Sequence, residues 1–264
     1  MIKVLRKVDD ILRIVAEMKD KATLIGLSRK LKIHKATISH ILKTMGELGY
    51  IEKSAAKCYS IGPRITELAD RSRRRSILQE VAAEETLSLS EKLRETTSVS
   101  VIHNGIRHRI THASVNQSVT VAVDVSEESR GAPYDTATGR MLMAYLDRDN
   151  LSLVLKKNGF PDRRWNNMEH EKVLKKTLAE IRNRGLAFWH ANDNQAEAIA
   201  VPIFGPDNRV WAALGVAVPA FRFRGKRREK IIRTLKSAGK EMSFNLALRY
   251  GEPEHKTGKS EKLK

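Results

Sequence analysis

The sequence predicts an α+β protein with two domains: a helical N-terminal domain that ends in a small β-hairpin, and a C-terminal domain built on an antiparallel sheet. Two changes of pattern along the chain support this prediction. Apolar residues recur with the helical period through residues 8–48, whereas from Ser98 onward they alternate with polar residues, as strands do. Hairpin turns, and not long crossovers, join the later strands, which favours antiparallel pairing with helices packed on the sheet.

Residues 8–18, 24–31 and 35–48 predict three helices, because each segment places apolar side chains at helical spacing. Thr23 is in position to cap the second helix, and Gly49 is in position to end the third. Two short helices joined by a tight turn are typical of a helix-turn-helix, whose second helix enters the DNA major groove. The face of the third helix that we expect to be buried contains Ile38, Ile41, Leu42, Met45 and Leu48.

The other face of the third predicted helix is polar and basic. Its lysines would suit backbone phosphates, and its short serine, threonine and histidine side chains would suit base edges. A basic, solvated helix face is common, so this face alone does not indicate DNA binding. The flanking sequence provides further evidence. Residues 50–61 predict a β-hairpin, or wing, that carries two lysines near its tip and is closed by Gly62 and Pro63. The residues predicted to contact DNA are Lys35, Ala36, Thr37, Ser39, His40, Lys43, Thr44, Lys53 and Lys57.

The remaining chain predicts a helical linker followed by the elements of the second domain. In the linker, residues 64–77, an arginine cluster around Arg73 could lie along phosphates or simply face solvent. A polar tail without an apolar period, residues 250–264, is expected to be disordered. Helices are expected at residues 78–97, 169–184 and 225–249, and strands near residues 99–110 and at 118–125, 186–190, 196–204 and 210–218.

Charge is segregated along the chain. The formal net charge of +18 divides into +10 over residues 1–75, −1 over residues 76–221 and +9 over residues 222–264. Charge that served solubility alone would not need to gather at both ends. The two basic segments are therefore expected to attract nucleic acid or an anionic membrane surface.

Several classes of function are disfavoured by what the sequence lacks. The single cysteine, Cys58, excludes a disulfide framework within the chain and a cysteine-based metal cluster, which fits a reducing cytoplasm. The N-terminus carries charges among its apolar residues, and no run of about eighteen apolar residues occurs, so neither a signal peptide nor a membrane span is expected. None of the common phosphate-loop, dinucleotide, hydrolase or zinc-protease motifs is present, so no cofactor is expected.

Two groups of polar residues could carry chemistry, but neither makes a convincing site. His103, His108 and His112 are close enough in sequence for a metal site, yet residues four apart in a strand share a face by its period of two alone. Asp193 and Glu197 could form a carboxylate pair, but no nucleophile or base accompanies them. We therefore expect no metal site and no catalytic residues.

Residues 22–69 resemble the winged helix-turn-helix of the IclR family of bacterial transcriptional regulators. The segments that carry the resemblance are His34–Leu42, Leu48–Ile51 and Tyr59–Gly62. Three positions depart from the family pattern: His34 stands at the usual proline, Ala36 at the usual serine and His40 at the usual arginine. The first two affect the start of the helix and a phosphate contact. The third removes a DNA-contacting guanidinium, so operator sequence or affinity could differ from the family norm.

Residues 131–146 are similar to the family's segment of the pattern lP…TAlGKalLA, with Arg140 at the usual lysine. The resemblance implies a GAF-like effector-binding domain, in which free N–H groups at this helix start would suit an anion. In the alternative, Thr136 caps the helix and Gly139 packs, with no ligand. Gln195 replaces a common glycine, so the ligand could be unusual or its binding lost. The residues that the resemblance implies for the effector are Thr136, Thr138, Gly139, Asp193, Ala198 and Ala200.

The matches together span roughly residues 5–249. They predict a winged helix-turn-helix domain at residues 1–63, the linker, an effector-binding and oligomerisation domain at residues 78–249, and the tail. The expected protein is a cytoplasmic regulator, not an enzyme, that binds palindrome-like operators in double-stranded DNA as a dimer or dimer of dimers. A small molecule, by family resemblance an organic acid, would modulate binding. Two alternatives remain: a small-molecule enzyme or carrier with incidental basic ends, and a sequence-blind DNA binder without a ligand response.

Overall fold

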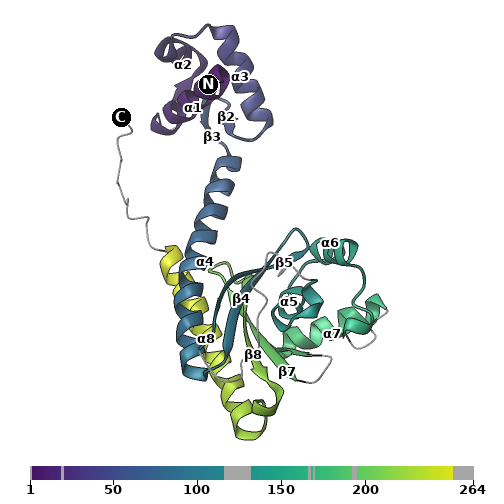
Figure 1. Cartoon of the computed structure of the whole chain (residues 1–264). Coiled ribbons are helices and arrows are strands. Elements are labelled where there is room, and N and C mark those ends of the chain that lie inside the picture. The colour runs from purple at the N-terminus through teal and green to yellow at the C-terminus, as the bar shows by residue number, and fades with distance from the viewer. Residues whose placement is uncertain are drawn as a thin grey trace. The chain divides into compact units, whose positions relative to one another are not determined.

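The computed structural model describes residues 2–18, 21–115, 132–165, 168, 170–191 and 195–251. The chain divides into two compact units, Met1–Ser76 and Ile77–Lys264, and the division falls inside the long helix α4 (Pro63–Leu93) (Figure 1). Among the described residues, no helix has the length and apolar character that a membrane crossing requires. Each unit has a core of its own, so each is described separately.

The N-terminal unit packs three helices against a small antiparallel sheet. The helices are α1 (Lys3–Glu17), α2 (Leu24–Leu31) and α3 (Lys35–Glu47). The sheet has the order β1–β3–β2, with strands Ala22–Thr23, Cys58–Ile61 and Ile51–Lys53. The three predicted helices and the predicted hairpin are all present. The two-residue strand β1 was not predicted, because two residues are too few to show a period. The core includes Ile11, Val15, Leu27, Ile38, Leu42, Met45 and Ile51.

Leu48 was predicted on the buried face of the third helix, and this was wrong. Its side chain is 57% exposed, because α3 ends at Glu47 and Leu48 lies at the edge of the apolar stripe, where the chain turns away. The remaining residues of that stripe are buried or partly buried: Ile38, Ile41, Leu42 and Met45.

Helix α4 continues without a break from the predicted linker into the second unit, but it ends earlier than expected. The prediction ran to residue 97, whereas the helix ends at Leu93 and strand β4 (Thr96–His103) begins three residues later. Arg94 adopts a left-handed φ of 55°, which stops the helix. Thr96 and Thr97 are β-branched and favour the extended strand, where the Thr97 hydroxyl donates to the Thr86 carbonyl (2.7 Å).

The second unit is built on a five-stranded antiparallel sheet of order β5–β4–β8–β7–β6. Its other strands are β5 (Ile106–Ala113), β8 (Val210–Pro219), β7 (Ala196–Phe204) and β6 (Ala187–His190). The predicted turn between β4 and β5 is confirmed, with Asn104 and Gly105 both at positive φ. The strand predicted at residues 118–125 lies outside the described residues.

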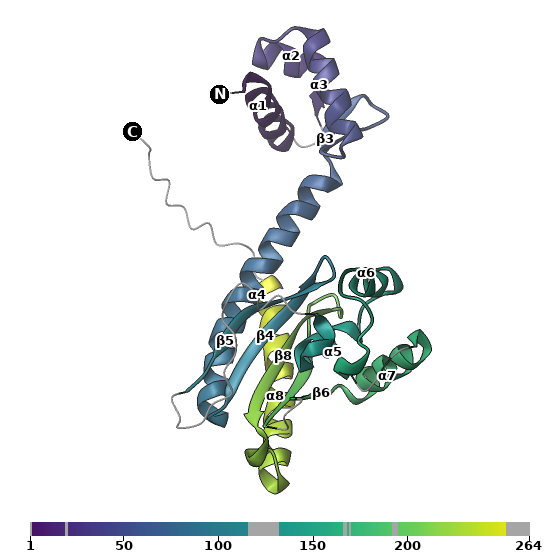
Figure 2. The ribbon, with the colours of Figure 1, turned by 45° about the vertical axis from the view of Figure 1, so that its right-hand side comes forward.

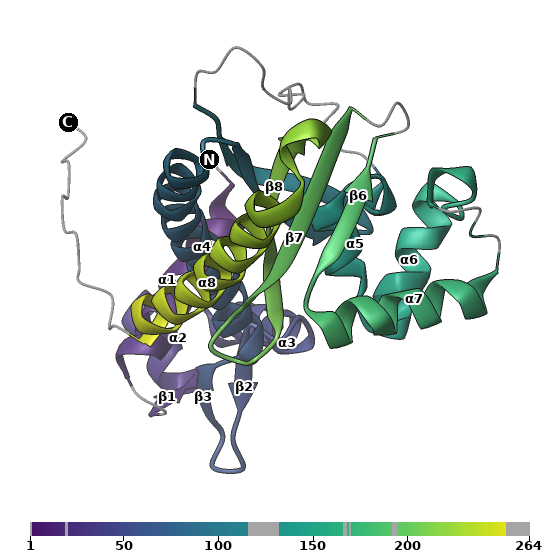
Figure 3. The same ribbon diagram turned by 90° about the horizontal axis from the view of Figure 1, so that it is seen from below.

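Helices cover both faces of this sheet (Figures 2 and 3). The second half of α4 and the C-terminal helix α8 (Gly225–Gly251) pack on one face, and α8 lies across β7 and β8. The other face carries α5 (Ala137–Met143), α6 (Arg148–Asn158) and α7 (Glu171–Arg184). Helix α6 was not predicted, because only Leu151 and Val154 are buried in it and the apolar pattern is too short.

Three smaller predictions in the second unit were wrong. The apolar pattern of the helices expected at residues 78–97 and 169–184 places Leu87 and Val173 inward, but both side chains are exposed. The tail was expected to begin at residue 250, but α8 continues to Gly251 because Tyr250 packs edge-on against Trp211, with ring centroids 5.4 Å apart. The rest of the predicted tail lies outside the described residues.

Candidate nucleic-acid interface and effector site

The tight turn before α3 is held by side-chain caps at both of its helices. Thr23 accepts a hydrogen bond from the Gly26 N–H (3.1 Å) and so caps α2, as predicted. Lys32 ends α2 in the left-handed conformation. His34 then caps α3, since its Nδ1 atom accepts from the Ala36 N–H at 3.4 Å. The histidine at the family's proline position therefore starts the helix through a hydrogen bond and not through a fixed φ.

The end of α3 is fixed to the wing by glycine. Gly49 has a φ of +74°, and the Tyr50 and Gly49 N–H groups donate to the Met45 and Gly46 carbonyls, which forms a Schellman motif. Gly62 lies directly against this turn, where an added Cβ would come within 2.3 Å of the Gly49 carbonyl oxygen. The helix that we expect to read DNA and the hairpin beside it are thus positioned by close backbone packing.

All nine residues predicted to contact DNA have exposed side chains. Ser39, Lys43 and Lys53 line one hollow of about 380 Å³ between α3 and the wing. Lys57 lies in the hairpin turn at a left-handed φ of 61°. Lysines from both elements therefore lie at the surface around one hollow, which Glu47 also lines, with its carboxylate 3.9 Å from Lys43 Nζ.

The arginine cluster at the start of α4 is partly engaged within its own helix. The Arg71 Nη2 atom lies 2.5 Å from Glu67 Oε1, and the Arg74 Nη2 atom lies 3.4 Å from Asp70 Oδ2. These ion pairs favour the solvent-facing alternative for Arg71 and Arg74 over a position along phosphates.

In the second unit, the predicted effector segment forms a short 3-10 turn, Pro133–Asp135, followed by the buried helix α5. Thr136 caps α5 by accepting from the Gly139 N–H (3.0 Å). Gly139 packs so closely on the turn that an added Cβ would lie 1.9 Å from the Pro133 carbonyl oxygen. Both residues therefore have a structural role, as the alternative without a ligand proposed.

Thr138 belongs to a buried polar cluster that sequence reasoning missed. Its hydroxyl donates to the Ser100 Oγ atom (3.2 Å), which also accepts from Arg107 Nη1 at 3.1 Å. Ser100, Arg107 and Thr138 are all buried. Cross-strand pairing places Arg109 opposite Ser100, on this same face of the sheet. A buried arginine within a strand has no sequence signature beyond the alternation of residues 106–109, which does not by itself show burial.

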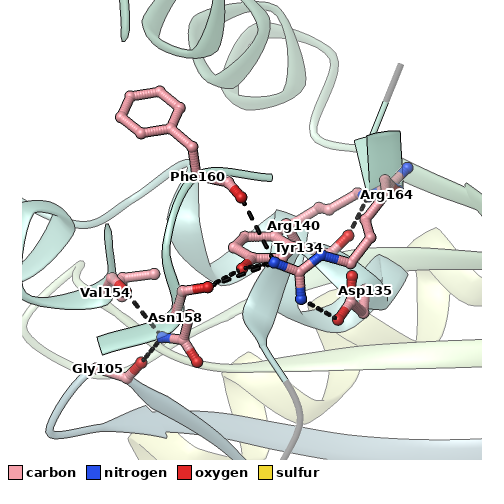
Figure 4. Close-up of polar contacts among 8 residues, drawn as sticks. All are labelled: Gly105, Tyr134, Asp135, Arg140, Val154, Asn158, Phe160 and Arg164. Atoms are coloured by element: carbon pink, nitrogen blue, oxygen red, sulfur yellow. Dashed lines mark hydrogen bonds and ion pairs between the residues drawn. The ribbon is translucent and has the colours of Figure 1, made fainter. Parts of the chain in front are cut away.

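Arg140 and Arg164 anchor the turn before α5 (Figure 4). Arg140 donates from Nε to the Tyr134 carbonyl (2.7 Å), and its guanidinium lies 4.4 Å from the Trp165 ring centroid. Arg164 donates to the Tyr134 hydroxyl (2.6 Å) and lies 3.6 Å from the Asp135 carboxylate.

The Tyr134 hydroxyl in turn donates to the Asn158 carbonyl, and the Asn158 amide reaches Gly105 in the β4–β5 turn (2.8 Å). The network thus ties the effector segment to α6 and to the sheet edge.

Burial perturbs the ionisation of this region. It lowers the pKa of Arg107 to about 10, with help from the nearby charge of Arg109, and it lowers the pKa of Arg140 to about 10. The pKa of Asp135 is raised above its usual 3.8, mainly by burial, although Arg164 opposes the shift. Among the described residues, the α5 side of the sheet therefore holds two buried guanidinium groups, Arg107 and Arg140, beside the partly buried carboxylate of Asp135.

Of the three remaining residues predicted to bind the effector, Ala198 and Ala200 lie on β7, and Asp193 is not among the described residues. Ala200 on β7 is fully buried and pairs with Gly215, where an added Cβ would lie 2.6 Å from the Thr138 methyl group. Small residues on β7 and β8 therefore let α5 approach the sheet. Ala198 is partly buried on the same face.

His108 and His112 do not share a face of the β4–β5 hairpin, contrary to expectation. The register shifts between Val99 and Ser100, so that His108 pairs with Val101 and His112 pairs with Ser98. Val101 and Ser98 lie on opposite faces, and the bulge therefore separates the two histidines. No group of three histidine, cysteine or acidic side chains suited to a metal ion occurs in the described part of the chain.

The two units define a winged helix-turn-helix regulator with a C-terminal effector-binding domain. The chain belongs to the IclR family: the model described as the IclR helix-turn-helix domain matches residues 4–55, and that described as the bacterial transcriptional regulator IclR C-terminal domain matches residues 73–244. These matches make it a DNA-binding transcriptional regulator and not an enzyme.

Individual relatives are distant but cover most of the chain. The HTH-type transcriptional regulator KdgR of Escherichia coli is 26% identical over 225 residues, which are 83% of this chain and 84% of that protein. The Pca regulon regulatory protein of Pseudomonas putida is 25% identical over 236 residues, 87% of this chain and 79% of that protein. An IclR homolog of Microbacterium hydrocarbonoxydans, solved with 4-hydroxybenzoate, shares the fold with a TM-score of 0.55 at 22% identity, over 92% of this chain and 99% of that one.

Proposed function

We propose that this regulator reads a palindrome-like operator as a homodimer or dimer of dimers in the cytoplasm, and that an organic acid in the second unit changes its affinity for that operator. The observation that carries the DNA assignment is the division of α3 into two faces. One face is buried in the core, and the other exposes Lys35, Ser39, His40 and Lys43. Such a helix can enter a major groove without losing the packing that holds it.

The dimer is supported by the exposed start of α1. Ile2, Val4 and Leu5 are apolar and largely exposed, which is unusual for side chains that no partner covers. One recognition helix per chain reads only one half-site, so a twofold dimer would supply the second reader and explain a palindrome-like operator.

The organic acid is supported by the buried cluster of Ser100, Arg107 and Thr138. A buried guanidinium is stabilised by an anionic partner, and a carboxylate accepts two parallel hydrogen bonds from arginine. The structural relative named above was solved with an aromatic carboxylic acid, which fits the same chemistry. The acid could alter DNA binding only by binding one conformation of the dimer more tightly than another.

Selection of DNA from a random pool by the purified full-length protein at physiological salt tests this function. The expected result is a motif with two related half-sites about one helical turn, or a small multiple of it, apart. A bound pool that stays random would instead identify a sequence-blind binder. The selected site then serves to screen organic acids for a change in affinity, and a screen without any response would reject the effector.

A further inference from the structure

The basic C-terminal segment is not explained by the winged unit, and in the structure much of its charge lies on α8. Five cations occur at helical spacing along the exposed side of this helix: Lys226, Lys230, Arg233, Lys236 and Lys240. Residues three and four apart on a helix are neighbours, so these side chains form one stripe. We call it the α8 stripe.

The members of the α8 stripe form no ion pair within the described residues, whereas several arginines of the same unit do. Elsewhere, Arg222 and Arg227 contact Glu95, and Arg249 contacts Glu80 and Glu84. Positive charge that is not neutralised locally remains available to an anionic partner.

Part of the stripe borders a groove of about 900 Å³ between α8 and β7, the α8–β7 groove. Arg233, Lys236 and Lys240 line it from α8, Arg184 lines it from α7, and Glu229 is the only carboxylate residue among the lining residues described. Its other lining side chains are largely apolar and include Tyr145, Val201, Pro202, Phe204 and Ile232.

The short edge strand β6 opens this groove. It begins at Ala187, which pairs with Ala200, so β7 continues from Val201 to Phe204 without a strand on that side (Figure 3). Gly239 brings α8 close to β7, since an added Cβ would lie 2.7 Å from a Val201 methyl group. An apolar floor and a cationic border therefore meet where β7 lacks a strand partner, although the Phe204 N–H at its end donates to Ser243 Oγ (3.0 Å).

We propose that the α8–β7 groove binds an acidic, partly apolar peptide segment of another protein. Acidic side chains of such a segment complement the cationic border, and its apolar side chains cover the floor. A DNA backbone would use the border but has no need of the apolar floor. A second copy of the same groove would bring like charges together, which disfavours self-association.

The test uses the full-length protein and a fluorescein-labelled peptide of alternating glutamate and leucine, followed by fluorescence anisotropy. Two further peptides separate the contributions, one with glutamine in place of glutamate and one of glutamate alone, each of equal length. The proposal expects the glutamate–leucine peptide to bind at least about tenfold more tightly than either of the others, because it alone satisfies both border and floor.

Substitutions inside and outside the α8–β7 groove test whether the peptide binds there. Arg233→Gln, Lys236→Gln and Lys240→Gln together should weaken binding of the glutamate–leucine peptide about tenfold or more. Lys156→Gln, Lys157→Gln and Lys176→Gln remove the same charge from exposed positions outside the groove and should change binding little. Ser237→Trp should also abolish binding, because the indole would fill the groove and leave its charges in place.

Three results would overturn the proposal. If the glutamate-only peptide binds as tightly as the glutamate–leucine peptide, the stripe is a general polyanion surface, such as one for DNA. If Ser237→Trp leaves peptide binding unchanged, the peptide does not occupy the groove. If Ser237→Trp lowers the molar mass of the free protein in light scattering, the groove is an interface between copies of this chain.

Discussion

At the start of α3, His34 stands where the family pattern has proline, and like proline it favours the start of a helix. His34 caps the helix through Nδ1, at the long distance of 3.4 Å. His34→Ala should therefore lower the free energy of unfolding by about 0.5 kcal/mol, the low end for removal of a cap. His34→Asp, which offers a stronger cap, should restore or exceed the original stability. Urea unfolding of the three proteins measures this, and equal stability of the alanine variant would show that the cap contributes nothing.

Arg107 is the residue on which the proposed acid effector depends most. Arg107→Gln should weaken the effect of an active organic acid on operator affinity by about 2 kcal/mol, roughly thirtyfold in the acid concentration required, because a charge-assisted hydrogen bond is removed. Arg107→Lys retains the charge and should have a smaller effect. Operator titrations at increasing acid concentration provide the measurement.

The pKa of Arg107 also predicts how the response to the organic acid depends on pH. Burial lowers the pKa of Arg107 to about 10, so its positive charge is lost only as the pH rises through that value. Between about pH 6 and 8 the guanidinium contribution should therefore be constant. A response that fell steadily across this range, or a glutamine variant that responded normally, would contradict the role of Arg107.

At the scale of elements, the sequence predicts those whose apolar pattern extends over several turns or alternations. Helices α1 and α3 and strands β7 and β8 belong to this group, because each buries a full face against a core. Helix α6 and strand β1 could not be predicted, since the first buries only Leu151 and Val154 and the second has two residues. The early end of α4 depended on one left-handed residue, Arg94, which no periodic pattern reveals.

The candidate sites were predictable to different degrees. Apart from Lys57, which lies in the hairpin turn, the proposed DNA-contacting residues lie on exposed parts of continuous elements, so their spacing in the sequence carries over to the surface. The polar cluster of Ser100, Arg107 and Thr138 joins two strands and a helix, and the separation of His108 from His112 results from a bulge. Such tertiary interactions and register shifts leave no local signal.

The proposed contact between the wing and DNA phosphates predicts how its two lysines affect DNA binding and its salt dependence. Lys53→Ala and Lys57→Ala should each weaken binding to every DNA sequence. Each should also reduce the slope of log affinity against log salt by about one for every phosphate that the lysine neutralises. Lys172→Ala, an exposed lysine on α7, is the matched control and should leave the slope unchanged. If the slope for the wing variants equals that of the original protein, the wing does not bind phosphates.

For the whole molecule, the proposed dimer makes the start of α1 an interface. Leu5→Glu should shift the molar mass in light scattering toward that of a single 29.8 kDa chain, because it places charge in an apolar interface. It should also weaken operator binding, since two half-sites would no longer be read together. Ile25→Glu changes an exposed apolar residue elsewhere in the same unit and should leave the mass unaltered.

The proposal that α3 reads the operator is tested most directly by measuring the operator affinity of a variant that carries Ser39→Ala, His40→Ala and Lys43→Ala together. All three side chains are exposed on α3, so the fold should be retained, and a folded circular dichroism spectrum is the control. We predict that the preference for the selected operator over random DNA falls at least about tenfold, because hydrogen bonds to base edges contribute about 1–3 kcal/mol each. An unchanged preference would show that another surface of the protein reads the operator.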